Sequence, residues 1–191
     1  MGDDRGRTVA GHSDGYEEFA ASRAGHLFRS ACLLTSGDTH LAEDLVQETL
    51  GRMYAVWGRA TRVDNPAGYA QTVLVRVFLA HRRRRSSGER PAALLPVASG
   101  RRAAGTPGTG TAEAAGTQDD AALRLDLLGA LARLPAKDRA VLVLRYWEDR
   151  SVEETAEAMR VSPTAVRVRS SRALAKVREL LGGSITEFAG R

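Results

Sequence analysis

Basic side chains are concentrated in a stretch of helical spacing near the end of the chain. Six basic residues and no acidic one lie between Arg160 and Arg178. At about 100° per residue, one face of this stretch holds Val166, Ser170, Ala173, Leu174 and Val177, and small or polar residues lie opposite. Small residues can reach base edges and arginines can hold phosphates, so this stretch suits DNA binding. The residues expected to contact DNA are Ser162, Thr164, Arg167, Val168, Arg169, Ser171 and Arg172.

The elements that must position this face are two capped helices. Ser151 followed by Glu154 forms a capping box, and Ser162 followed by Pro163 is a typical start for a second helix. A capped helix, a short turn and a second capped helix form the helix-turn-helix pattern. The local pattern alone also fits a plain helical hairpin with a solvated basic face, so both interpretations stay open at this point.

The overall charge favours an anionic partner. The chain has 191 residues, a formal net charge of +5 and a pI of about 10.0. Its basic residues are 26 arginines and 2 lysines, and arginine is the residue best suited to phosphate recognition. A GC-rich genome would give the same ratio of arginine to lysine, so the ratio itself does not decide the matter.

The sequence lacks the residues that a disulfide framework, a metal site or a catalytic site would need. The single cysteine, Cys32, excludes a disulfide framework and a cysteine metal cluster, and its apolar neighbours predict a core position. The four histidines are scattered, and no acid–base pair emerges, so we expect no enzymatic activity, no catalytic residue, no cofactor and no metal. The first residues have no apolar segment, so we expect no signal sequence, and no run comes near the roughly 18 apolar residues of a membrane span. A soluble cytoplasmic protein without membrane insertion is therefore expected.

Helical periodicity without any period-two alternation predicts an all-α fold. Two small helical domains are expected, at residues 13–86 and 119–182, with residues 1–13 disordered and a loose tail after about Gly182. Residues 87–118 are rich in Gly, Ala, Thr and Pro, which predicts a flexible linker that does not fix the placement of the domains. The GTPGTG sequence within it has no preceding strand, so it is assigned to the linker rather than to a phosphate-binding loop.

Two helices of the N-terminal domain have distinct outer faces. The helix from about Thr39 to Trp57 is expected to bury its apolar stripe and to expose Asp44, Gln47 and Glu48. The next helix is expected to run from Pro66 to about Arg85 and to turn the following residues away from its core: Thr72, Val75, Arg76, Leu79, Arg82 and Arg83. The four consecutive arginines at its end exceed what compensation of the helix dipole needs, which favours DNA contact.

Two blocks of this sequence resemble regions of the sigma-70 family of transcription factors. HLAEDLVQETLGRMYAVW resembles the core of region 2, and LPAKDRAVLVLRYWEDRSVEETAEAMRVSPTAVRVRSSRALAKVREL resembles region 4. The short linker leaves no room for regions 1.1 or 3, which is the layout of extracytoplasmic-function (ECF) sigma factors of the actinobacterial kind. The resemblance implies a sigma factor that binds core RNA polymerase and directs promoter-specific transcription initiation. An ordinary helix-turn-helix transcriptional regulator is the alternative, although it would not explain the acidic patch of the first block.

The resemblance also implies roles for individual residues. The family's DLVQE segment docks on the clamp of the polymerase β′ subunit, which here selects Asp44, Gln47 and Glu48, and the β flap is the expected partner of region 4. At the −10 element the family uses the loop after this helix, here Gly58 to Asn65, and the following basic helix. The expected −10 contacts are therefore Asn65, Arg76, Arg82 and Arg83. The helix from Ser162 to Lys176 is expected to read the −35 element.

The resemblance has departures and further implications. Ser170 stands where the family usually has an apolar residue, and Val168 stands where serine is common, so any base contact at residue 168 would be apolar. An anti-sigma factor that clamps between the domains is a further candidate partner, with transcriptional control of its own gene as the alternative. Core polymerase and promoter DNA place the expected site of action at the nucleoid.

Overall fold

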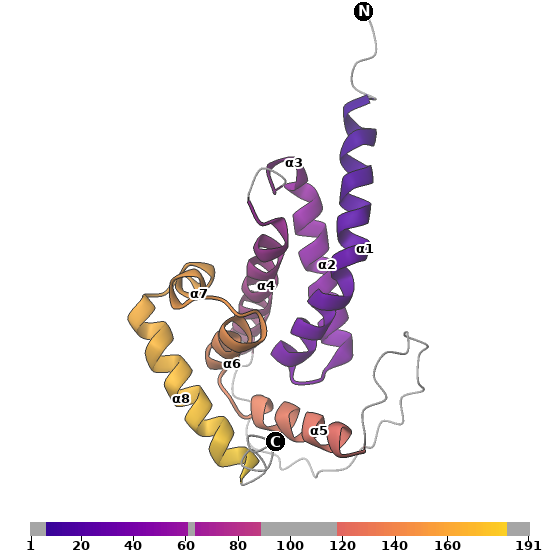
Figure 1. Ribbon diagram of the computed structural model, residues 1–191. Coiled ribbons are helices and arrows are strands. Elements are labelled where there is room, and N and C mark those ends of the chain that lie inside the picture. Colours follow the sequence, from indigo (N-terminus) through magenta and orange to yellow (C-terminus); the bar gives the residue numbers. More distant parts are fainter. Residues whose placement is uncertain (1–6, 61–63, 89–117, 183–191) are drawn as a thin grey trace, which may run out of the picture.

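The computed structural model describes residues 7–60, 64–88 and 118–182, which are almost entirely helical (Figure 1). The N-terminal domain consists of α1 (Arg7–Thr35), α2 (Thr39–Ala55), α3 (Trp57–Ala60) and α4 (Pro66–Gly88). The C-terminal domain consists of α5 (Gln118–Ala132), α6 (Ala136–Leu142), the π-helical turn η1 (Val143–Trp147), α7 (Val152–Met159) and α8 (Pro163–Leu181). No strand occurs in these ranges, so the all-α prediction is confirmed. The expected linker, with its GTPGTG sequence, and the expected tail lie largely outside the described residues.

The first helix begins earlier than the sequence pattern suggested. It starts at Arg7, although residues 1–13 were expected to be disordered, so that expectation is wrong for residues 7–13. Adding turns to an existing helix is far easier than nucleating one, which explains the extension.

The N-terminal domain is a bundle of α1, α2 and α4 around an aliphatic core. The turn between α1 and α2 places Gly37 at a φ of 91°, which suits glycine, and Asp38 then caps α2 by accepting a hydrogen bond from the Leu41 N–H at 3.0 Å. Apolar side chains from the three helices are fully buried at the centre: Leu27, Leu34, Leu45, Met53, Leu74 and Phe78.

The segment after α2 is partly helical, whereas Gly58 to Asn65 was expected to be a loop. The backbone of Val56 leaves the helical region at φ −119° and ψ 11°, and the short helix α3 follows at once. The Trp57 ring packs against Tyr16 and Phe19 with centroids 5.4 and 4.7 Å apart. This aromatic contact fixes the start of α3 on α1, while residues 61–63 lie outside the described part of the chain.

The two domains pack directly against each other, although the linker was expected to leave their placement unfixed. Figure 1 shows α6 and α7 beside α4, and α5 across the end of the α1–α2 pair. The main hydrophobic core is continuous between the domains, since it joins residues of α1, α2 and α4 to Val141, Leu144, Ala158 and Val166. Apolar faces of the two domains therefore meet in one core, which places them relative to each other.

This packing also corrects the predicted outer face of α4. Val75 and Thr72 were expected to point away from the core, yet they are only 1% and 9% exposed. They are buried because the C-terminal domain, including α6 and α7, covers that side of α4. An apolar residue such as Val75 on a predicted outer face was therefore a sign of a second packing partner.

The buried face of α8 includes one polar side chain, that of Ser170. Ser170 is 8% exposed, and its hydroxyl has no hydrogen-bond partner within the described residues. It lies on the same face as Val166, Ala173 and Val177, which are all buried. A buried hydroxyl without a partner lowers stability by an amount that mutation can measure.

We expect Ser170→Ala to stabilise the protein by about 1 kcal/mol more than Ser171→Ala does. Both changes give the helix the same gain in propensity, but Ser171 is exposed, so the difference isolates the buried hydroxyl. Chemical denaturation of the parent and the two variants measures the free energy of unfolding. Equal stability of the two variants would contradict the burial of an unpaired hydroxyl at residue 170.

Candidate nucleic-acid interface

The first helix of the helix-turn-helix is fixed by a complete capping box. The Ser151 hydroxyl accepts a hydrogen bond from the Glu154 N–H at 3.0 Å, and the Glu154 carboxylate accepts one from the Ser151 N–H at 2.8 Å. The bond from the Ser151 backbone N–H, helped by its side chain, lowers the pKa of Glu154. The predicted start of α7 is thereby confirmed.

The turn between α7 and α8 is tight and contains one strained residue. Arg160 adopts the left-handed conformation at φ 55° and ψ 52°, which is unfavourable for a residue with a Cβ. The Val161 N–H donates to the Ala156 carbonyl at 3.0 Å, and the Ser162 hydroxyl caps α8 by accepting from the Ala165 N–H at 3.1 Å. These bonds orient α8 relative to α7 as the sequence predicted.

The predicted outer face of α8 is exposed in the structure. Val168 is 42% exposed, and its inward neighbour Val166 is fully buried. The other residues expected to reach bases are also exposed: Ser162, Thr164, Ser171 and Arg172. The structure therefore presents a continuous small and polar surface on α8 of the kind that a major groove can accept.

The arginines of α8 differ in the ion pairs that they form. Arg169 donates to Asp138 of α6 at 2.5 Å in a half-buried ion pair, and Arg167 donates to Glu153 of α7 at 3.1 Å in an exposed one. Arg172 is exposed and forms no ion pair within the described residues. Of the three, Arg172 needs to break no contact before it meets DNA.

The acidic face of α2 lies on the N-terminal domain as expected. Asp44 and Gln47 are exposed, while Leu45 and Val46 between them are buried, which confirms the predicted division of the faces. Glu48 is half-buried and forms ion pairs with Arg52 at 2.6 Å and with Arg84 at 3.8 Å. Asp44 and Gln47 are thus the parts of the patch with the greatest freedom to bind a partner.

The residues expected to contact the −10 element divide into two groups. Arg82 and Arg83 are exposed on α4 and line a basic groove of about 730 Å³ between the domains. Arg76 is instead bound to α7, where it donates to the carbonyl of Ala158 at 2.9 Å. Asn65 caps α4 by accepting from the Gly68 N–H at 2.7 Å. The structure therefore brings Asn65 and Arg76 to the boundary between the domains.

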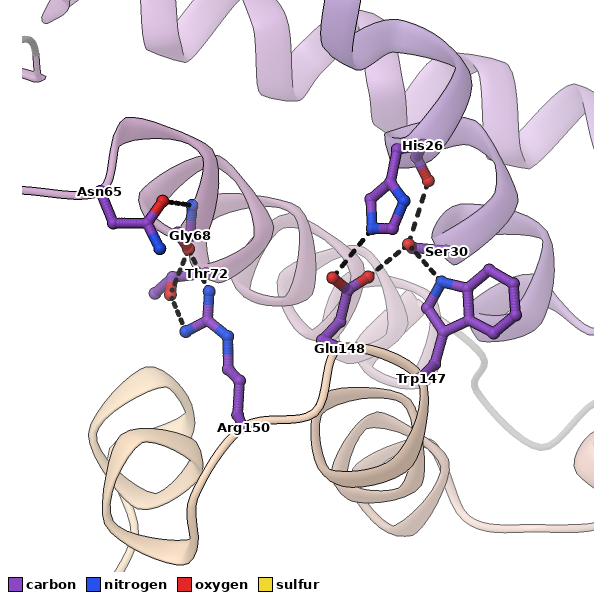
Figure 2. Close-up of polar contacts among 8 residues, drawn as sticks. All are labelled: His26, Ser30, Asn65, Gly68, Thr72, Trp147, Glu148 and Arg150. Carbon is purple, nitrogen blue, oxygen red and sulfur yellow. Dashed lines mark hydrogen bonds and ion pairs between the residues drawn. The ribbon is translucent and has the colours of Figure 1, made fainter.

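Sequence analysis missed the polar residues that join the domains. Glu148 bonds to His26 and Ser30 of α1, and Arg150 bonds to the start of α4 (Figure 2). No local pattern indicates these pairs, because the partners lie 78 to 122 residues apart in the sequence. The only available signal was the charged WEDR sequence just before the capping box.

A buried arginine makes a further connection between the domains. Arg139 of α6 is 6% exposed and donates to the carbonyl of Leu34 at the end of α1 at 2.7 Å. Burial lowers the pKa of Arg139 to about 10, so the guanidinium remains charged near neutral pH.

Membrane-spanning helices and metal sites are absent from the described residues. None of the helices in the described ranges is both long and apolar enough to cross a membrane. The described residues also contain no group of three or more His, Cys, Asp or Glu side chains arranged to hold a metal ion. Cys32 is half-buried and packs against the main core, as its apolar neighbours predicted.

An exposed basic helix of a helix-turn-helix, carried by a pair of all-α domains, defines a DNA-binding transcription protein. Residues 20–88 match the family Sigma-70 region 2, and residues 124–177 match Sigma-70, region 4. The RNA polymerase sigma-E factor of Streptomyces avermitilis is 34% identical over 166 residues, which cover 87% of this chain and 84% of that protein. The sigma-E factor of Streptomyces coelicolor is also 34% identical, with 87% and 85% covered.

A solved structure shares the fold. The sigma factor RpoE from Bartonella quintana, crystallised in complex with the anti-sigma factor NepR, matches with a TM-score of 0.63 and 23% identity, covering 87% of this chain and 96% of that one. The chain belongs to the sigma-70 family and is an ECF-type RNA polymerase sigma factor. It binds core RNA polymerase and directs promoter-specific transcription initiation.

Proposed function

We propose that this sigma factor reads the −35 element with the outer face of α8 and the −10 element with α4 and the residues before it. The observation that carries this proposal is the exposed, small and polar face of α8, flanked by arginines, on a fully capped helix-turn-helix. Arg172 is proposed to contact bases and Arg167 to contact phosphates. At the −10 element the proposed contacts are Asn65, Arg76, Arg82 and Arg83.

For the polymerase, we propose that α2 provides the docking surface. Asp44 and Gln47 stand exposed on one face of a helix whose other face is buried, and Glu48 adjoins them. We infer further that the chain itself is not an enzyme, since the polymerase supplies the chemistry. Its proposed partners, core polymerase and promoter DNA, place it in the cytoplasm at the nucleoid.

We also propose that the chain binds an anti-sigma factor. The support is the shared fold with a sigma factor that was crystallised with such a partner, NepR. The groove between the domains, lined by Arg82, Arg83, Lys137 and Arg160, offers a basic surface for it.

Asp44→Arg combined with Gln47→Ala should weaken binding to core polymerase by about tenfold or more, which is about 1.4 kcal/mol, because a positive charge replaces a negative one at the centre of the docking face. Titration of labelled protein with purified core polymerase measures the affinity. Glu18→Arg is a matched charge reversal on the exposed surface of α1, outside both family regions, and should change the affinity little. Unchanged affinity in the first variant would reject the docking surface.

Arg172→Ala should reduce discrimination between the cognate −35 sequence and mutated ones, with about 1–3 kcal/mol lost on the cognate site. Arg167→Ala should weaken binding to all sequences alike and reduce the salt dependence by about one counterion. Promoter fragments identified by run-off transcription with core polymerase provide the DNA. The same loss on every sequence in both variants would refute the division between base and phosphate contacts.

Affinity purification of the chain from its own cells under non-inducing conditions should return a protein that blocks run-off transcription when added back to the purified system. Such an inhibitor would act by competing with polymerase or promoter for the surfaces described above. Recovery of polymerase subunits alone would count against the anti-sigma proposal and leave the polymerase proposal intact.

A further inference from the structure

We propose that Asp138 and Arg169 form a positioning pair, which sets the orientation of α8 on α6 so that the exposed face of α8 meets the −35 bases. Arg169 then acts through the orientation of its helix and does not itself contact DNA, although the sequence pattern placed it among the DNA-binding residues. The inference rests on the proposed role of α8 at the −35 element.

Arg169 lies close to the buried face of α8. At about 100° per residue it is about 60° from Val166, whose side chain is fully buried, whereas Arg167 lies about 100° away on the opposite flank. The side chain of Arg169 is 35% exposed, compared with 60% for that of Arg167. Arg169 therefore lies at the edge of the contact between α8 and the rest of its domain, and the surface available to DNA begins beyond it.

The partner of Arg169, Asp138, belongs to a helix on which α8 packs. Helix α8 packs against both α6 and α7 (Figure 1). Asp138 lies in the first turn of α6, and its carboxylate accepts a hydrogen bond from Arg169 Nη1 at 2.5 Å. The adjacent residue, Arg139, is the buried cation that joins α6 to the end of α1. The pair therefore connects α8 to a helix whose own position is fixed by Arg139.

The ion pair on the other flank of α8 is of a different kind. Arg167 donates to Glu153 of α7 at 3.1 Å, and both side chains are more than half exposed. Exposed ion pairs add little stability, so Arg167 can leave Glu153 for a phosphate at little cost. Asp138 is only 18% exposed, and release of Arg169 would leave this partly buried carboxylate without its partner, which is costly.

The orientation of α8 matters because base readout depends on geometry. Base edges in the major groove are distinguished by hydrogen bonds, which form only over a narrow range of distance and angle. Arg172, the residue proposed to contact bases, lies about one turn beyond Arg169 on α8. A tilt of α8 on α6 would displace Arg172 from its base, while phosphates, which occur all along DNA, would stay within reach of other cations. Loss of the pair should therefore reduce sequence discrimination more than overall binding.

The test uses the full chain reconstituted with core polymerase and carrying Asp138→Asn, Arg169→Gln or both changes. Promoter fragments with the cognate or a mutated −35 element are the probes, and the ratio of the two affinities measures discrimination. The neutral double variant is decisive for salt dependence, because it removes the arginine without leaving an unpaired carboxylate beside the DNA. Glu153→Gln is the matched control, since it breaks the exposed pair on the other flank of α8. Circular dichroism confirms that each variant is folded.

The two single variants and the double variant should each lower discrimination by about fivefold, with no greater loss in the double variant, because all three remove the same interaction. The salt dependence of the double variant should equal that of the parent, whereas loss of a phosphate contact would reduce it by about one counterion. Arg169→Lys should retain most of the discrimination, because the pair uses one guanidinium nitrogen, which an ammonium can replace. Glu153→Gln should discriminate like the parent.

Asp138→Asn decides the matter alone if the variants of Arg169 fail to fold. A positioning pair predicts that this variant loses discrimination. An Arg169 that binds phosphate would instead be freed from its partner, and the variant would bind every sequence more tightly with unchanged discrimination.

Two results would overturn the proposal. Unchanged discrimination in folded Asp138→Asn and Arg169→Gln variants would show that the pair does not position α8. Loss of about one counterion in the double variant would show that Arg169 contacts a phosphate. Arg172→Ala separates either failure from failure of the proposed −35 role: if it too discriminates like the parent, α8 does not read bases, and if its discrimination falls, only the positioning role is removed.

Discussion

The arrangement of the molecule depends on one buried cation, Arg139. Its guanidinium donates to the Leu34 carbonyl of α1, to the Ala132 carbonyl at the end of α5, and to the Leu134 carbonyl in the turn that follows. Removing a guanidinium from water is costly unless polar groups replace the solvent, and the carbonyls near two helix ends do so for Nη1 and Nη2, although Nε has no partner within the described residues. Arg139 therefore links α1, α5 and α6 at one point, and this link sets where the rest of the C-terminal domain can lie.

The link at Arg139 also determines where the residues that follow it in the chain lie. With α6 held against α1, the π-helical turn η1 brings Glu148 to His26, and Arg150 then lies against the start of α4. The next helix, α7, ends where Arg76 can bond to its last carbonyls. Polar contacts at these points surround a hydrophobic core that is continuous between the domains. The position of α8 is thus determined by the packing of the elements that precede it.

Features that depend on neighbouring residues could be predicted from the sequence. The caps at Ser151 and Ser162, and the buried and exposed faces of α2 and α8, follow from hydrogen bonds and periodicity within a few residues. The contact between domains could not be predicted in this way, because Arg139 and Leu34 are 105 residues apart. Periodicity also assigned Val75 to an outer face, since a single helix pattern cannot indicate that a second domain packs there.

The two partners in each contact between the domains differ in how mutation can affect them, which bears on the evolution of the protein. The donors in these contacts are the side chains of Arg76, Arg139 and Arg150. The acceptors are mainly backbone carbonyls. A backbone carbonyl is still present after any substitution at its own residue. Only a substitution of the arginine therefore removes one of these hydrogen bonds. A single codon change at an arginine could therefore weaken the domain contact, and a single reversion could restore it, without a compensating change in the partner helix. Coupling between the domains is consequently a property that a lineage of such proteins can adjust in small, independent steps.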